Sequence, residues 1–142
     1  IQTLTKNRDD NGFRFKIINA ALSKRALWQK WWVTTPSDTS PGADWFQVKT
    51  VDLSEIGHDF NVLVADCEGA LYYILQDFPE LLNNVVTILV ENDYRSMEHL
   101  LWVENHFKSK GFVLRYAAPS DEARGYNLPS HRNFFQTWQR CL

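Results

Sequence analysis

Hydrophobic residues in the second half of the chain alternate between strand-like runs and helical spacing. Continuous apolar runs at residues 61–65 and 85–90 predict strands that are buried on both faces, as in a parallel sheet. Apolar residues at helical spacing follow each run, namely Leu71, Ile74, Leu75 and Phe78, then Met97, Leu100, Leu101, Val103 and Phe107. Asp77 and Glu80 predict a capping box for a short helix through Leu82. Gly111 is the expected end of the longer second helix.

The first half of the chain has weaker, strand-like patterns. Residues 13–20 follow a turn signal at 10–12 (Asp-Asn-Gly) and predict a strand. Residues 26–35 and 45–53 flank a loop rich in Pro, Ser and Gly. These two flanks predict an antiparallel hairpin with a long loop.

The predicted order of elements indicates an α/β fold. Residues 112–117 and 133–138 add two last strands after the alternating strands and helices. We expect a doubly wound sheet whose parallel strands are flanked by helices, with a C-terminal antiparallel hairpin. The 142 residues, 44% of them hydrophobic, fit one domain over 1–142.

Charge and composition exclude several classes of protein. The formal net charge of −2 gives no strong field toward nucleic acid or an anionic membrane. No apolar run approaches the ~20 residues that a membrane helix needs. The two cysteines are too few for a disulfide scaffold or a zinc site. We therefore expect a cytoplasmic protein that binds neither membrane nor nucleic acid.

Polar residues follow three predicted strands, at the edge where doubly wound sheets bind their ligands. Asn19 and Ala20 end the first of these strands. Asp66 and Glu68 follow the second, and Glu-Asn-Asp at residues 91–93 follows the third. This repeated placement is the most function-like pattern in the sequence.

The acids have alternative interpretations. Asp66 and Glu68 either contact a ligand and accept a proton from a substrate hydroxyl, or cap a helix that starts near Ala70. If the two strands are neighbours, Glu91 and Asp93 lie beside Asp66, where they could bind a substrate hydroxyl or a metal, or simply be solvated. We predict that they belong to a substrate site and that there is no metal site.

Two further groups of residues are candidates for binding. His131 lies in the loop before the last predicted strand, on the expected ligand side, and is a substrate-site candidate. Four tryptophans concentrate in the predicted hairpin, at positions 28, 31, 32 and 45. Core packing or a subunit interface is favoured for them over stacking on sugars or bases.

At residues 62–70 the chain (VLVADCEGA) resembles the LKIDVEGAE segment of FkbM-type S-adenosylmethionine-dependent methyltransferases. The similarity continues through the next helix and strand to Glu91. Residues 19–23 (NAALS) resemble the family's NAALSD segment, and 48–53 (VKTVDL) resemble the strand that leads into its TLDDL element. Residues 133–138 (NFFQTW) resemble its closing NFY.VW strand.

This resemblance implies a function. It implies O-methyl transfer from S-adenosylmethionine to a hydroxyl of a small metabolite or a sugar. It assigns Asp66 and Glu68 to catalysis, and Asn19, Ala20 and Asp66 to the cofactor side. The family's glycine-rich cofactor loop has no counterpart here, because no two of the six glycines form a Gly-x-Gly. We therefore predict weak or no cofactor binding by this chain alone.

The missing loop also predicts a partial Rossmann-like sheet. The chain resembles the C-terminal two-thirds of such an enzyme, whose sheet order is three-two-one-four-five-seven-six. Without strands one and two, the fourth strand gains an open edge, which is an aggregation hazard unless it is covered. We hypothesise that the strand at 13–20 pairs with this edge or that a second copy of the chain covers it, so we expect a homo-oligomer.

A function of another class remains open beside the enzyme. The chain could be a non-catalytic α/β module that self-associates through the open edge and the Trp-rich hairpin. A third interpretation is a carbohydrate-binding protein that uses the tryptophans. Binding of the cofactor would favour the enzyme, and a concentration-dependent mass without such binding would favour the module.

Overall fold

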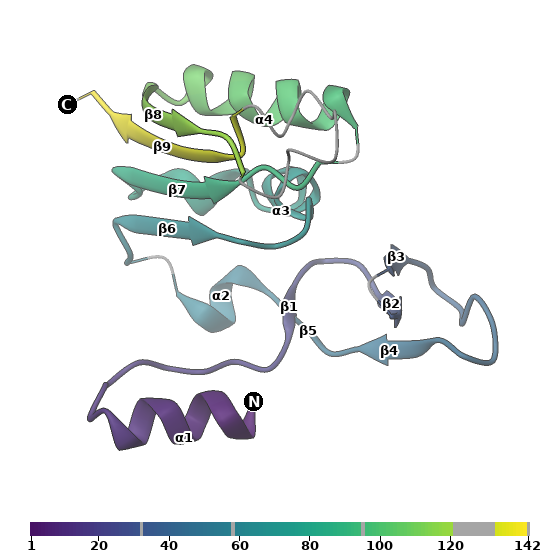
Figure 1. Cartoon of the computed structure of the whole chain (residues 1–142). Helices are drawn as coiled ribbons and strands as arrows, with labels where there is room; N and C mark the ends of the chain where they lie inside the picture. The colour runs from purple at the N-terminus through teal and green to yellow at the C-terminus, as the bar shows by residue number, and fades with distance from the viewer. Residues whose placement is uncertain (32, 58, 95, 121–132, 142) are drawn as a thin grey trace. The chain divides into compact units, whose positions relative to one another are not determined.

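The computed structural model, which describes residues 1–142 except 32, 58, 95, 121–132 and 142, is a mixed α/β protein with parallel and antiparallel strands (Figure 1). The general α/β prediction is therefore confirmed. The chain divides into two units, residues 1–55 and 56–142, and each is described by itself.

Residues 1–55 form two small sheets, one helix and most of a second, short helix. Strand β2 pairs antiparallel with both β3 and β4, while β1 pairs parallel with β5. The predicted hairpin is confirmed in the pairing of β2 with β4, and the chain adds β3 by turning back after Trp31. The elements are α1 (Gln2–Asp10), β1 (Ala21–Leu22), β2 (Leu27–Lys30), β3 (Val33–Pro36), β4 (Phe46–Val48), β5 (Thr50–Val51) and α2 (Leu53–Ile56).

The predicted strand at residues 13–20 is wrong. These residues have no strand structure, and the adjoining strand β1 contains only two residues. Phe13 and Phe15, which gave the segment its strand-like pattern, are exposed and contact one another, with ring centroids 6.4 Å apart. Strand propensity reflects packing against neighbouring strands, and this segment pairs with none.

Residues 56–142 contain a four-stranded sheet in the order β6-β7-β9-β8 (Figure 1). Strands β6 and β7 are parallel, whereas β9 runs antiparallel to both β7 and β8. The predicted C-terminal antiparallel hairpin is thus confirmed. The elements are β6 (Val62–Ala65), α3 (Leu71–Asp77), the 3-10 helix η1 (Pro79–Leu82), β7 (Thr87–Glu91), α4 (Met97–Ser109), β8 (Phe112–Ala118) and β9 (Phe135–Arg140).

One face of this sheet forms the core. Ile88 and Val90 of β7 and Trp138 of β9 point into it and are almost completely buried. Helix α4 packs against this face through Phe107, whose ring lies 5.4 Å from that of Trp138 and 6.2 Å from that of Phe112. Helix α3 packs against α4. The alternation of side chains along β7 and β9 therefore sends every second residue into a helix-covered core, whereas in β8 only Phe112 is buried.

The opposite face of the sheet is open in this unit. Val64, Leu89 and Tyr116 lie in register across it and have 71%, 40% and 59% of their surface exposed. The prediction that residues 61–65 and 85–90 are buried on both faces is therefore wrong. For the first run there is a second reason, because among the described strands β6 lies at the edge of the sheet and pairs with β7 alone.

The predicted capping box at Asp77 and Glu80 is also wrong. Helix η1 begins after Phe78, and no side-chain hydrogen bond caps it. A reciprocal box forms instead at α2, where Asp52 Oδ1 accepts from the backbone N–H of Ser54 at 2.9 Å and Glu55 Oε1 accepts from that of Asp52 at 2.9 Å. Both pairs of acids are three residues apart, but Asp52 lies directly before α2, whereas Asp77 lies one residue before Phe78, the N-cap of η1. Only Asp52 is therefore placed to accept from the first turn of its helix.

Candidate functional site

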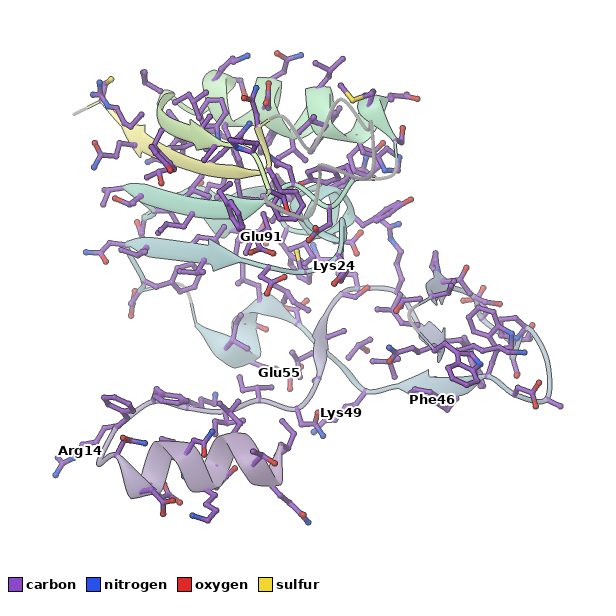
Figure 2. All side chains as sticks on the ribbon, viewed as in Figure 1. Arg14, Lys24, Phe46, Lys49, Glu55 and Glu91 are labelled. Carbon is purple, nitrogen blue, oxygen red and sulfur yellow. The ribbon has the colours of Figure 1, made fainter. Side chains whose placement is uncertain are left out.

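The carboxyl ends of β6 and β7 lie side by side and carry acidic residues. Asp66 follows β6, Glu91 ends β7, and Asp93 comes two residues later. Each of the three offers a carboxylate oxygen, and these oxygens all lie within 4.8 Å of one another. Glu91 is labelled at this end of β7 in Figure 2. The expected proximity of Glu91 and Asp93 to Asp66 is confirmed. We call these three residues the acidic cluster.

A tight turn brings the two strand ends together. Glu68 and Gly69 have positive φ angles of 52° and 79°, so the chain reverses sharply between β6 and α3. A Cβ atom placed on Gly69 would lie 3.3 Å from the backbone oxygen of Asp93 and 3.7 Å from Cα of Tyr94. Glycine therefore favours this close approach of the loop after β6 to the loop after β7, both through its positive φ and through its lack of a Cβ atom.

The electrostatics of the acidic cluster act mainly on Glu91. Burial raises the pKa of Glu91 above its ordinary value, and the charges of Asp66 and Asp93 raise it further. A hydrogen bond with Asp66 and the charge of Glu68 raise this pKa as well. Glu91 therefore keeps its proton to a higher pH than an ordinary glutamate does.

This arrangement has two chemical capacities. An ionised carboxylate only accepts hydrogen bonds, so the cluster can bind a hydroxyl and take its proton. Carboxylate oxygens are also the ligands that hard divalent cations prefer, and Asp66, Glu91 and Asp93 could together hold one. A cluster of acids with water access is common without an ion, and the prediction of no metal site stays untested.

The alternative in which Asp66 and Glu68 cap a helix is not what the structure has. Helix α3 starts after Ala70, and no side chain makes a capping hydrogen bond there. Both acids are exposed instead. Their carboxylates remain available to a ligand, although Glu68 is not among the three residues whose oxygens come together.

Two residues that directly follow acids of the cluster, Cys67 and Tyr94, were not among the predicted site residues. Burial raises the pKa of the Cys67 thiol to about 11, and the charges of Asp93 and Asp66 contribute to the same shift. Tyr94 is 3% exposed, and burial also raises the pKa of its hydroxyl. Both residues stand next to acids in the sequence, and that adjacency is the signal that could have indicated them.

Buried hydrogen bonds hold the loop that carries Asp93. The Asn92 side chain is 1% exposed and donates from Nδ2 to the backbone oxygen of Asn133 at 2.6 Å. Its backbone N–H donates to the oxygen of Phe134 at 2.8 Å. The loop after β7 is thereby tied to the start of β9. Asn92 thus anchors the loop, and its two neighbours in the sequence, Glu91 and Asp93, belong to the acidic cluster.

The remaining predicted site residues lie elsewhere. Asn19 and Ala20 belong to the first unit and come directly before β1. Their assigned position on the cofactor side stays a prediction. His131 lies outside the described residues, so its expected place in the substrate site is not described either.

The tryptophans of the first unit fall into different environments. Trp28 is half-buried and donates from Nε1 to the backbone oxygen of Ser37 at 3.0 Å. Trp31 has 81% of its surface exposed and a positive φ of 55°. Trp45 is half-buried, and its ring would be 3.5 Å from a Cβ on Gly42. Packing within the unit therefore accounts for Trp28 and Trp45 and leaves Trp31 unexplained.

Comparisons with known proteins add no family to these observations. No protein-family model matches the chain, nor does any curated protein or solved structure. Among the helices in the described part of the chain, none has the length and apolar character to cross a membrane.

Proposed function

We propose that this chain corresponds to the C-terminal two-thirds of an FkbM-type S-adenosylmethionine-dependent methyltransferase acting on a hydroxyl of a small metabolite or a sugar. The observation that carries the proposal is the acidic cluster at the joined carboxyl ends of β6 and β7. Ligands of doubly wound sheets bind at this edge. The resemblance of residues 62–70 to the family falls on the same loop.

The topology of the sheet supports the same proposal. Its order β6-β7-β9-β8 agrees with the four-five-seven-six part of the family's sheet order. Strand β9 is inserted antiparallel between β7 and β8, although it comes last in the sequence. We infer that these strands are a partial Rossmann-like sheet in which β6 takes the place of strand four.

In the proposed reaction the chain has to take one proton and to orient the acceptor. When bound, the cofactor supplies a sulfonium methyl group for in-line displacement by the acceptor oxygen. Asp66 is the residue that we propose takes the proton of the acceptor hydroxyl, with Glu68 beside it. Asp93 and Glu91 orient the acceptor.

The carboxylates of the cluster fit the hydroxyls of a ribose or an acceptor, because they offer only acceptor atoms when ionised. On the cofactor side we propose Asp66 together with Asn19 and Ala20. The family's glycine-rich loop is absent from the sequence, and we therefore expect affinity for the cofactor to be weak.

Nuclear magnetic resonance can detect such weak binding. Titration of the labelled chain with S-adenosylhomocysteine should shift backbone resonances at residues 66–69 and 91–93. Asp66→Asn should reduce these shifts, whereas Glu98→Gln, at an exposed position on α4, should leave them unchanged. A folded chain without shifts in either loop would contradict the proposed function.

The second candidate is the non-catalytic α/β module that self-associates. The observations that favour it are the edge position of β6 and the exposed ring of Trp31. It predicts a mass that depends on concentration and a chain indifferent to S-adenosylhomocysteine. The same titration, with the mass measured at each concentration, separates the two candidates.

A further inference from the structure

We propose that two copies of this chain associate through strand β6, pairing antiparallel about a twofold axis to continue the sheet. The inference concerns the edge of the sheet and does not depend on methyl transfer. It starts from β6 (Val62–Ala65), for which β7 is the single neighbour among the strands that the structure describes.

In the described part of the chain, no strand pairs with the backbone groups along the outer edge of β6. The carbonyl oxygen of Asn61 accepts from the backbone N–H groups of Val86 and Thr87 at 2.8 and 3.2 Å, so it points toward β7. Backbone direction alternates along a strand, and the N–H and C=O groups of Val62 and Val64 therefore point to the open edge. A strand in that position is a ready template for another chain.

Nothing in β6 opposes such pairing. Its sequence, Val-Leu-Val-Ala, contains no charged residue and no proline, and its pairing with β7 runs without a bulge. Val62 and Val64 have 46% and 71% of their surface exposed. Natural edge strands are usually protected by charges, proline or bulges, and β6 has none of these devices.

The strand is complementary to a second copy of itself. With Leu63 on the twofold axis, Val62 lies opposite the partner's Val64, and Val64 lies opposite the partner's Val62. These are the residues whose backbone groups point outward, so each pair exchanges both of its N–H to C=O bonds. Side chains at opposed positions lie on the same face, and the exposed valines therefore contact one another across the axis.

Charge favours this antiparallel arrangement. Asp66, which follows β6, would lie opposite the partner's Phe60. The two acidic clusters would thus be placed at opposite ends of the paired strands, and no like charges would face each other. A second copy of the chain presents the same edge, so it can pair with β6 without a partner of another sequence.

The mass of the chain, measured by light scattering or sedimentation over a wide range of concentration, tests the proposal. The native chain should form dimers whose fraction rises with concentration. Val64→Pro removes an outward N–H that the sheet does not use, and proline is tolerated at such edge positions. This variant should keep its far-ultraviolet circular dichroism and weaken the dimer by about tenfold or more.

Two further variants keep the test decisive. Val64→Lys places a charge on the edge and should also give monomers, so it decides the matter if Val64→Pro does not fold. Leu101→Lys changes an exposed apolar residue of α4 and should dimerise like the native chain. A native chain that stays monomeric at every concentration would overturn the proposal, since another segment or protein would then be the occupant of the edge. A dimer that survives both Val64 substitutions would overturn it as well.

Discussion

Gly69 lies directly against the backbone of Asp93. A Cβ atom at Gly69 would come within 3.3 Å of the Asp93 carbonyl oxygen, and Gly69 also has a positive φ of 79°. The close approach joins the loop after β6 to the loop after β7. The position of Asp66 relative to Glu91 and Asp93 therefore depends on a residue that has no side chain.

Gly69→Ala should destabilise the protein and spread the acidic cluster. The left-handed backbone costs a non-glycine residue about 1–2 kcal/mol, and the clash with Asp93 adds to that cost. We expect a loss of roughly 2–3 kcal/mol in the free energy of unfolding, measured by urea denaturation.

Gly111→Ala is the matched control for this loss. Gly111 has a similar φ of 82°, but the nearest atom to its Cβ position is the side-chain Cγ of Arg140 at 3.9 Å. It should lose only the backbone term of about 1–2 kcal/mol. Equal losses in the two variants would mean that the contact between Gly69 and Asp93 adds no constraint.

Glu91→Gln should stabilise the protein at neutral pH. The pKa of Glu91 is raised above its ordinary value of 4.5 in the fold, so the unfolded chain releases this proton first as the pH rises. The contribution of Glu91 to stability is thus fully present below pH 4.5 and is lost as the pH rises through its folded pKa.

The difference in unfolding free energy between Glu91→Gln and the native chain should accordingly be positive at pH 7 and shrink toward pH 4. Urea denaturation at several pH values measures it. Glu98→Gln, an exposed acid in the first turn of α4, should show no such gain. A Glu91→Gln difference that does not vary with pH would show that the charges of Asp66 and Asp93 do not act on this carboxyl.

The sequence predicted the second unit better than the first for a physical reason. In residues 56–142 the helices α3 and α4 repeat apolar residues on one face and have a sheet to pack against, so periodicity and tertiary structure agree. In residues 13–20 the alternating pattern had no neighbouring strand to pair with, and propensity alone did not form a strand. Burial of β6 was overestimated because an apolar run does not reveal whether both faces of the strand are covered.

The candidate site was also predicted from the sequence only in part. Asp66, Glu91 and Asp93 could be placed together from sequence, because parallel strands bring their carboxyl ends to one edge. The role of Gly69 as the contact with Asp93 could not, since it depends on the spacing of two loops.

Cys67 should react slowly with alkylating reagents. Its pKa of about 11 leaves on the order of one thiol in a thousand ionised at pH 8, and the thiolate is the reactive form. Cys141 is exposed and should react first. Mass spectrometry of the folded Cys141→Ser variant, treated with iodoacetamide, should show little modification until urea is added. Rapid labelling of Cys67 in the folded chain would contradict its burial.

Gln136→Met should destabilise the second unit by about 1–3 kcal/mol. Gln136 is 2% exposed, and its Oε1 accepts from Trp138 Nε1 at 2.7 Å while its Nε2 donates to Glu104 Oε1 at 2.8 Å. Methionine preserves the volume but leaves the buried indole N–H without an acceptor. Gln139→Met, at an exposed position on the same strand, should change the free energy of unfolding by less than about 0.5 kcal/mol.

Trp31→Gly should leave the protein as stable as before or more stable by up to about 1 kcal/mol. Trp31 has a positive φ of 55° that glycine adopts freely, and the lost ring is 81% exposed. Val33→Gly, in strand β3 of the same hairpin, should instead cost about 0.5–1 kcal/mol. Thermal unfolding followed by circular dichroism measures both changes. A Trp31→Gly variant that loses stability only at high protein concentration would show that the ring is buried between copies of the chain, whereas a loss at every concentration would contradict its exposure.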